Sequence, residues 1–134
     1  MLNDKLIDVA REVRERAYAP YSGFKVGAAI MAEDGTIYSG CNIENASYSH
    51  SICAERVALF KAVGVGARIF QAIAIVTELD NPASPCGACR QVLAEFSPDM
   101  QVLMANTRGK VITSTVKELL PMAFSNSDLR EDKF

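Results

Sequence analysis

The sequence predicts an α/β fold, a three-layer α/β/α sandwich in which helices cover both faces of a mixed five-stranded sheet. Stretches of strand and helix character alternate along the chain in the order α-β-β-α-β-α-β-β-α. A tight turn joins the first two strands, which favours antiparallel pairing, whereas a helix separates later strands, which favours parallel pairing through crossovers. Residues 69–78 form a continuous apolar run, typical of a central strand covered on both faces.

The first half of the chain is expected to contain a surface helix, a hairpin and a buried helix. Apolar residues at helical spacing follow a cap at Asn3 or Asp4, and Pro20 is expected to end this helix. Two strands within residues 24–44 flank an Asp-Gly turn, a strong hairpin signal between β-rich segments. Residues 53–63 are apolar on almost every side, which indicates a buried helix, and two nearby glycines supply its stop.

The second half continues the alternation and adds the remaining strands. The expected elements are a strand over 69–78, a helix over 87–96, a strand over 101–106, a strand over 111–114 and a helix over 116–120. Because there is no repeat, linker or low-complexity tract, one domain over residues 1–134 is expected.

Composition narrows the classes of partner. The chain has 134 residues and a formal charge of −2, with no block of basic residues, so a nucleic-acid partner is disfavoured. Its first 16 residues alternate charged and apolar side chains, unlike a signal peptide or a membrane span. The expected location is therefore the cytoplasm, where cysteines serve metal binding or catalysis more often than disulfides.

Three cysteines are expected to meet at one point. Cys86 and Cys89 form a Cys-x-x-Cys motif at the start of one predicted helix, and Cys53 begins another. Alone, the motif also fits half of a zinc ribbon or a redox dithiol. Helices that start at the same sheet edge bring their N-termini together, and three protein ligands with one open position are the pattern of catalytic zinc.

Two charged residues in the helix that begins at Cys53 are candidates for chemistry. Glu55 is either a partner of the helix dipole or a general acid and base; burial raises the pKa of a carboxyl group towards a useful range, and the neighbouring metal site favours the second role. Arg56 is a candidate for a charge-assisted hydrogen bond to the thiolates, with Arg90 as a second candidate. Cys41 is interpreted as a small buried apolar residue. The sole histidine, His50, is given no role.

The motifs resemble those of a known enzyme family. "CAE" followed by "PCGAC" matches the zinc-deaminase pattern in which cysteine replaces the first histidine ligand. Together with "AYAPYSGFKVGAA" and "GCNIENASYS", these segments are similar to the small, homotetrameric cytidine deaminases over nearly the whole chain. The resemblance implies a cytidine deaminase-like fold and one Zn²⁺ per subunit, held by Cys53, Cys86 and Cys89.

The resemblance also implies roles for further residues. In this family an activated water attacks C4 of cytosine while the residue matching Glu55 moves protons, yielding uridine and ammonia. Asn42 and Glu44 match the pair that binds the ribose 3′-hydroxyl. The aromatic ring of Phe24 and the backbone of Ala54 match contacts to the pyrimidine. Tyr48 and Phe124 match positions that reach a neighbouring subunit's site, which implies a homotetramer with sites completed across interfaces.

Other functions compete with deamination of cytidine and deoxycytidine for pyrimidine salvage. A deaminase of blasticidin S shares the three-cysteine core, although the intact "NIEN" segment favours nucleosides. A non-catalytic structural zinc module and a thiol-redox role are the alternatives from other classes. The sequence does not rank cytidine against deoxycytidine, since both present the same groups apart from the 2′-hydroxyl.

Overall fold

The computed structural model describes residues 2–129. Its elements are α1 (Leu2–Arg14), β1 (Gly27–Ala32), β2 (Ile37–Cys41), the 3₁₀ turn η1 (Tyr48–His50), α2 (Ala54–Gly64), β3 (Phe70–Thr77), α3 (Gly87–Phe96), β4 (Gln101–Asn106), β5 (Val111–Thr115), α4 (Val116–Leu119) and α5 (Asn126–Leu129). Among these residues, no helix is both long and apolar enough to span a bilayer.

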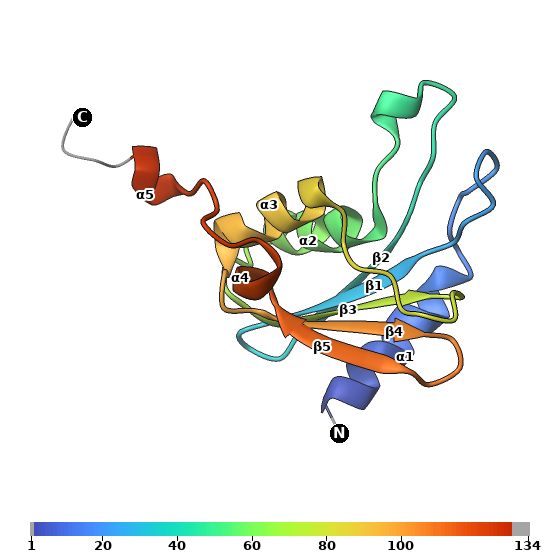
Figure 1. Cartoon of the computed structure of the whole chain (residues 1–134), viewed down its shortest axis with the longest axis horizontal. Helices are drawn as coiled ribbons and strands as arrows, with labels where there is room; N and C mark the ends of the chain where they lie inside the picture. Colours follow the sequence, from blue (N-terminus) through green and yellow to red (C-terminus); the bar gives the residue numbers. More distant parts are fainter. Residues whose placement is uncertain (1, 130–134) are drawn as a thin grey trace.

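The five strands form one mixed sheet in the order β2-β1-β3-β4-β5 (Figure 1). β1 pairs antiparallel with both β2 and β3, β3 pairs parallel with β4, and β4 pairs antiparallel with β5. The parallel pair is joined through α3, as expected for a crossover connection. Seven of the eight residues of β3 are buried, which confirms the central strand predicted from its apolar run.

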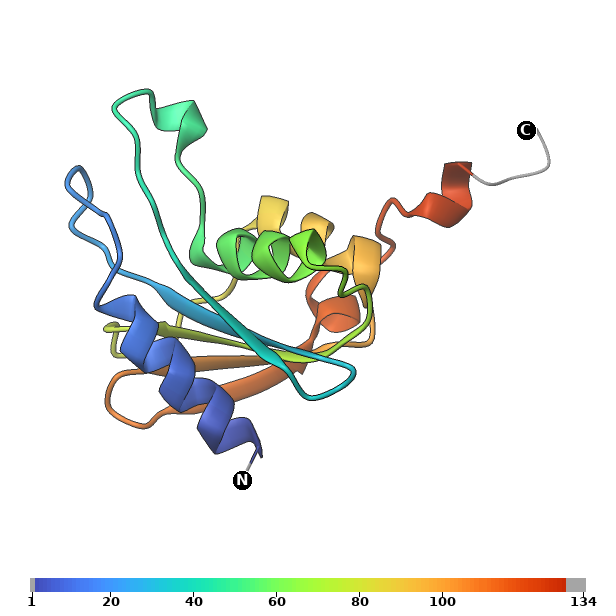
Figure 2. The same cartoon turned by 180° about the vertical axis from the view of Figure 1, so that it is seen from behind.

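Helices cover both faces of the sheet, which confirms the predicted three-layer sandwich. α1 lies along one face, and α2 and α3 lie on the other (Figures 1 and 2). Each face has its own apolar core: Leu6 and Leu103 belong to the cluster under α1, and Leu59 and Ile73 to the cluster under α2 and α3. Side chains alternate between the faces of a strand, so β3 contributes to both clusters.

Three local features differ from the sequence-based expectations. α1 ends at Arg14, well before Pro20, because the backbone N–H of Tyr18 donates to the carbonyl of Asn42 and draws the chain away from the helix. β2 ends at Cys41, so residues 42–44 follow the strand and are not part of it. The two short helical segments η1 and α5 were not predicted.

β2 and α2 approach each other closely at Gly40. A Cβ atom built on Gly40 would lie 2.5 Å from the amide nitrogen of Ala58 and 2.9 Å from the carbonyl oxygen of Ala54. Only a residue without a side chain fits this contact. Gly40 therefore lets the first turns of α2 lie directly on the hairpin, which sets the position of the residues at the N-terminus of α2.

Candidate active site

The three predicted cysteines meet at one point, as expected from their positions in the chain. The sulfur atoms of Cys53, Cys86 and Cys89 all lie within 4.8 Å of one another. Cys53 and Cys86 are the N-cap residues of α2 and α3, and the backbone N–H of Cys89 donates to the Cys86 sulfur at 3.5 Å. Two helix N-termini thus direct their partial positive charge towards the same group of thiols.

This set of donors fits zinc. The Sγ atoms of Cys53 and Cys86 are 3.9 Å apart. Two sulfurs bound to one tetrahedral Zn²⁺, each about 2.3 Å from the metal, would be separated by about 3.8 Å. Three thiolates leave one of four positions open, and this is the arrangement of a catalytic site. A closed structural site would require a fourth protein ligand.

Arg56 stabilises negative charge on the thiols. Its Nη2 atom donates to the sulfur of Cys53 at 3.4 Å. Hydrogen bonding with Cys89 and with the Arg56 guanidinium lowers the pKa of Cys53 to about 5. The same sulfur–guanidinium contact raises the pKa of Arg56 above its ordinary value. The structure therefore places Arg56 where the sequence predicted a cation beside the thiolates.

Arg90, the second candidate for this contact, lies elsewhere. Its guanidinium donates to the carbonyl oxygens of Pro85 and Leu119 at 2.8 and 2.7 Å, and to the hydroxyl of Ser84 at 2.8 Å. These three bonds connect the segment before α3 to the end of α4. Arg90 holds the backbone beside the cysteines in place and makes its own contacts away from the sulfurs.

Glu55 is a buried carboxyl group beside the thiols. Only 5% of its surface is exposed, and it lies in the first turn of α2, two residues after Cys53. Loss of hydration on burial raises the pKa of Glu55 to about 7, an effect that the negative charge of Cys53 reinforces. A carboxyl group with a pKa near neutrality can both accept and donate a proton, as acid–base chemistry requires.

A pocket of about 310 Å³ opens in front of these groups. Its volume is at the lower end of the range for small-molecule sites. Seven of the predicted residues line it, from four separate parts of the chain: Phe24, Asn42, Glu44, Cys53, Ala54, Glu55 and Cys86. No lysine or arginine is among the residues that line the pocket in the described chain, so it offers no cationic side chain to a phosphate.

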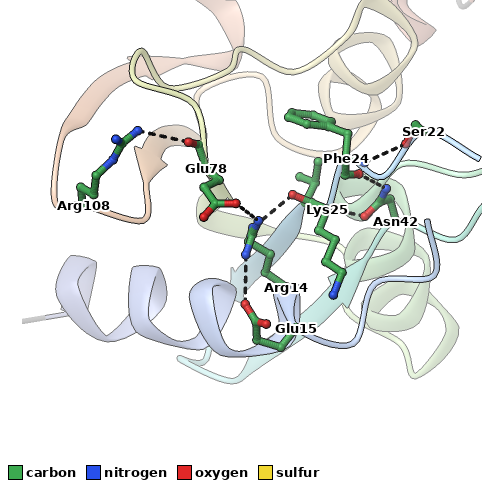
Figure 3. Close-up of polar contacts among 9 residues, drawn as sticks. Arg14, Glu15, Ser22, Phe24, Lys25, Asn42, Glu78 and Arg108 are labelled. Atoms are coloured by element: carbon green, nitrogen blue, oxygen red, sulfur yellow. Dashed lines mark hydrogen bonds and ion pairs between the residues drawn. The ribbon is translucent and has the colours of Figure 1, made fainter. Parts of the chain in front are cut away.

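Asn42 and Glu44 hold the loop that carries Phe24. The Asn42 side chain accepts from the N–H of Val26 and donates to the carbonyl of Phe24, both at 2.8 Å. Figure 3 shows the Asn42 amide beside the backbone of Phe24. Glu44 binds the same loop at Ser22. The two predicted sugar-binding residues thus also shape one wall of the pocket.

The far side of this loop is held by Arg14. Its Nε atom donates to the carbonyl of Lys25 at 3.2 Å, and its guanidinium pairs with Glu15 at 3.0 Å and with Glu78 at 3.2 Å (Figure 3). Arg14 is buried, and Arg108 adds a bond to the carbonyl of Glu78. The loop is consequently anchored to α1 as well as to the segment after β2.

Tyr48 and Phe124 do not line the pocket within this chain. Tyr48 is 74% exposed and its ring lies 5.8 Å from that of Tyr21, edge to face. Phe124 is 60% exposed, and its backbone carbonyl accepts from Gln91 at 2.8 Å. Figure 1 shows η1 on a projecting loop and the segment before α5 extending from the opposite end of the body.

Sequence reasoning missed several residues of the pocket wall. Thr77 and Ile75 come from the end of β3, and Ser84 comes from the segment before α3. The hydroxyl oxygen of Thr77 is buried without a hydrogen-bond partner among the described residues. A signal for Thr77 existed, since ligands bind beyond the carboxyl ends of parallel strands. Ser22 was also missed, and no pattern in its neighbourhood distinguishes it from an ordinary turn residue.

Comparisons with known proteins agree with this geometry. Residues 2–105 match the family described as "Cytidine and deoxycytidylate deaminase zinc-binding region". A cytidine deaminase from Sporosarcina psychrophila is 57% identical over 127 residues, which cover 94% of this chain and 93% of that protein. A blasticidin-S deaminase from Bacillus cereus is 33% identical, with 92% of each chain covered.

Solved structures give the same result for the fold. The crystal structure of a cytidine deaminase from Burkholderia pseudomallei superimposes with a TM-score of 0.90 at 50% sequence identity. The match covers 92% of this chain and 100% of that one. The similarity in fold therefore extends over most of this chain.

Proposed function

The chain belongs to the cytidine and deoxycytidylate deaminase family and is a zinc-dependent hydrolytic deaminase, and on this premise we propose how its own residues act. The substrates are cytidine and deoxycytidine, and the products are uridine or deoxyuridine and ammonia. Cys53, Cys86 and Cys89 hold the zinc ion. The observation that supports this proposal best is the convergence of three thiols and the buried Glu55 carboxyl on one pocket.

Proton transfer is assigned to Glu55. Bound zinc supplies Lewis-acid activation of the water that attacks C4 of the ring. Glu55 accepts a proton from this water and delivers it to N3, while the oxygen bonds to C4. Glu55 then moves the remaining hydroxyl proton to the amino group, which leaves as ammonia as the C4 carbonyl forms. Its low exposure keeps bulk water from competing for these protons.

Substrate binding is assigned to the pocket wall around Glu55. Phe24 packs on the pyrimidine, and the backbone of Ala54 contacts the carbonyl side of the ring. Asn42 and Glu44 bind the 3′-hydroxyl of the sugar. After its bonds to the loop, the Asn42 amide retains one N–H donor, and the Glu44 carboxylate retains an acceptor position, so both have capacity for a hydroxyl group.

Two further proposals concern the assembly and the compartment. The chain acts as a single catalytic domain within a homotetramer, in which Tyr48 and Phe124 reach a neighbouring subunit's site; their exposure supports this. A tetramer mass in light scattering would agree with the proposal, and a monomer with full activity would contradict it.

A cytoplasmic location suits three thiols that must stay reduced to bind metal.

The test of the function is ammonia release from cytidine by the zinc-loaded protein. The Glu55→Gln variant keeps the size of the side chain but removes its acid–base capacity, and it is expected to release no measurable ammonia while retaining zinc. Glu95→Gln is the matched control, because Glu95 is an exposed residue of α3. Blasticidin S is the comparison substrate. Turnover of blasticidin S without turnover of cytidine would contradict the proposed substrate class.

A further inference from the structure

Ser22 lies between the two groups that the proposed function assigns to sugar and base. Its hydroxyl donates to Oε2 of Glu44, and the same hydroxyl oxygen accepts from the backbone N–H of Phe24 at 3.0 Å. Figure 3 shows the second of these contacts, with the Ser22 hydroxyl close to the Phe24 backbone. One hydroxyl group therefore connects the Glu44 carboxylate to the residue that carries the pocket's aromatic ring.

The contacts of Glu44 identify the oxygen that remains available. Oε1 accepts two backbone N–H groups, from Tyr21 at 3.0 Å and from Ser22 at 3.1 Å. A carboxylate oxygen has two lone-pair sites, so both sites of Oε1 are taken. Oε2 accepts only the Ser22 hydroxyl among the described residues, and one of its lone-pair sites is left. A sugar hydroxyl must therefore share Oε2 with Ser22.

This arrangement orients the carboxylate before substrate arrives. Glu44 follows β2, and the isolated bridges of its neighbour Ile43 with Tyr18 and Ile52 hold the backbone of this segment. The hydroxyl and N–H of Ser22, with the N–H of Tyr21, keep the pKa of Glu44 below its usual range, so the group stays ionised. An ionised carboxylate held by three donors loses little further freedom when it binds a hydroxyl group.

We propose that Ser22 is a positioning residue for nucleoside binding, whose hydroxyl aims Oε2 of Glu44 at the 3′-hydroxyl of the sugar and joins it to the Phe24 backbone. The proposal rests on the proposed function, since it takes Glu44 as the group that binds the sugar. Because the sugar is bound in the same way before and during reaction at C4, losing this alignment raises KM and leaves kcat nearly unchanged.

The test combines variants of Ser22 with a substrate that lacks the hydroxyl. In the zinc-loaded protein, Ser22→Ala is expected to raise KM for cytidine about tenfold, the size of effect typical of a lost hydrogen bond to a charged group, with kcat within about twofold. With 3′-deoxycytidine, the KM values of wild type and Ser22→Ala are expected to agree within about twofold. The two substrates differ in their response to the substitution only if its effect acts through the 3′-hydroxyl.

Three further variants complete the design. Ser22→Thr retains a hydroxyl group, and its KM for cytidine is expected to lie close to that of the wild type. Ser22→Cys keeps the shape of the side chain but is a poor donor, and its KM is expected to be raised as in Ser22→Ala. Ser114→Ala is the control, because Ser114 lies on β5, at the edge of the sheet opposite β2. It is expected to leave KM and kcat unchanged for both substrates.

Two outcomes are distinguishable. If wild type releases no ammonia from cytidine, the proposed function fails. If wild type is active but Ser22→Ala impairs cytidine and 3′-deoxycytidine equally, or if Ser22→Thr is as impaired as Ser22→Ala, the role of Ser22 is overturned while the function stands.

Discussion

Replacing Gly40 by alanine is expected to displace the helix that carries the catalytic carboxyl group. The new Cβ would lie 2.5 Å from the Ala58 nitrogen, 2.9 Å from the Ala54 oxygen and 3.0 Å from the carbonyl carbon of Val57. All three atoms are backbone atoms of α2, so no side chain can rotate away. The shortest contact is about 1 Å below ordinary van der Waals distance, and α2 must move from β2 by a similar amount.

The cost follows from this displacement. Overpacking of a rigid contact destabilises a protein by about 1–3 kcal/mol. With an unfolding entropy of about 2.1 cal/mol/K per residue, a loss of about 3 kcal/mol lowers the melting temperature by about 10 °C. Because Cys53 and Glu55 lie at the N-terminus of α2, a shift approaching 1 Å is also expected to lower kcat for cytidine by about ten- to hundredfold.

The assay pairs this variant with alanine at the other end of the same helix. Gly64 is the last residue of α2, and a Cβ built there meets no atom within 4 Å. Gly64→Ala is therefore expected to be neutral or to stabilise by up to about 1 kcal/mol. Melting is followed by circular dichroism at fixed zinc and protein concentration. A Gly40→Ala protein that melts within about 2 °C of wild type at full activity would contradict the close contact between β2 and α2.

Three other substitutions test separate parts of the structure. Leu59→Ala opens a cavity under α2, where the side chain is fully buried, and is expected to cost about 2–5 kcal/mol in chemical denaturation; a loss below about 1 kcal/mol would contradict the packing described. Thr115→Ala removes the hydroxyl that caps α4 at 3.1 Å and is expected to cost about 1 kcal/mol, with cytidine turnover unaffected. Asn42→Asp keeps an acceptor but loses the N–H that binds the Phe24 carbonyl at 2.8 Å, and it is expected to raise KM for cytidine at least about tenfold. An unchanged KM would contradict the role of Asn42 in holding the loop that carries Phe24.

The arrangement of the cysteines was predictable from the sequence because it depends on local rules. Cys53 and Cys86 each precede a helix, and helices on one face of a sheet that start at the same edge bring their N-termini together. The burial of Glu55 followed from the apolar character of its helix. The central position of β3 followed from a continuous apolar run of strand length, the pattern of a strand covered on both faces.

Contacts between loops were not predictable in this way. The loop around Ser22 turns at Gly23, whose φ of 70° lies in the left-handed region, and only this path brings backbone donors to Glu44. One partner of Arg90 is likewise distant in sequence, since Leu119 lies 29 positions away. Such contacts depend on the path of irregular backbone, which has no periodic pattern to identify it.

The pairing of β1 with β3 also determines when the pocket can form during folding. Gly27 is the partner of Val76, so the chain must close a loop of nearly 50 residues before the two strands meet. Phe24 lies just before β1 and Thr77 ends β3, and the antiparallel register brings these two lining residues of the pocket to the same end of this slow pairing. A newly synthesised chain therefore acquires a substrate-binding site only after β1 and β3, the paired strands farthest apart in the sequence, have joined. Recovery of turnover after refolding is a measure of that late event.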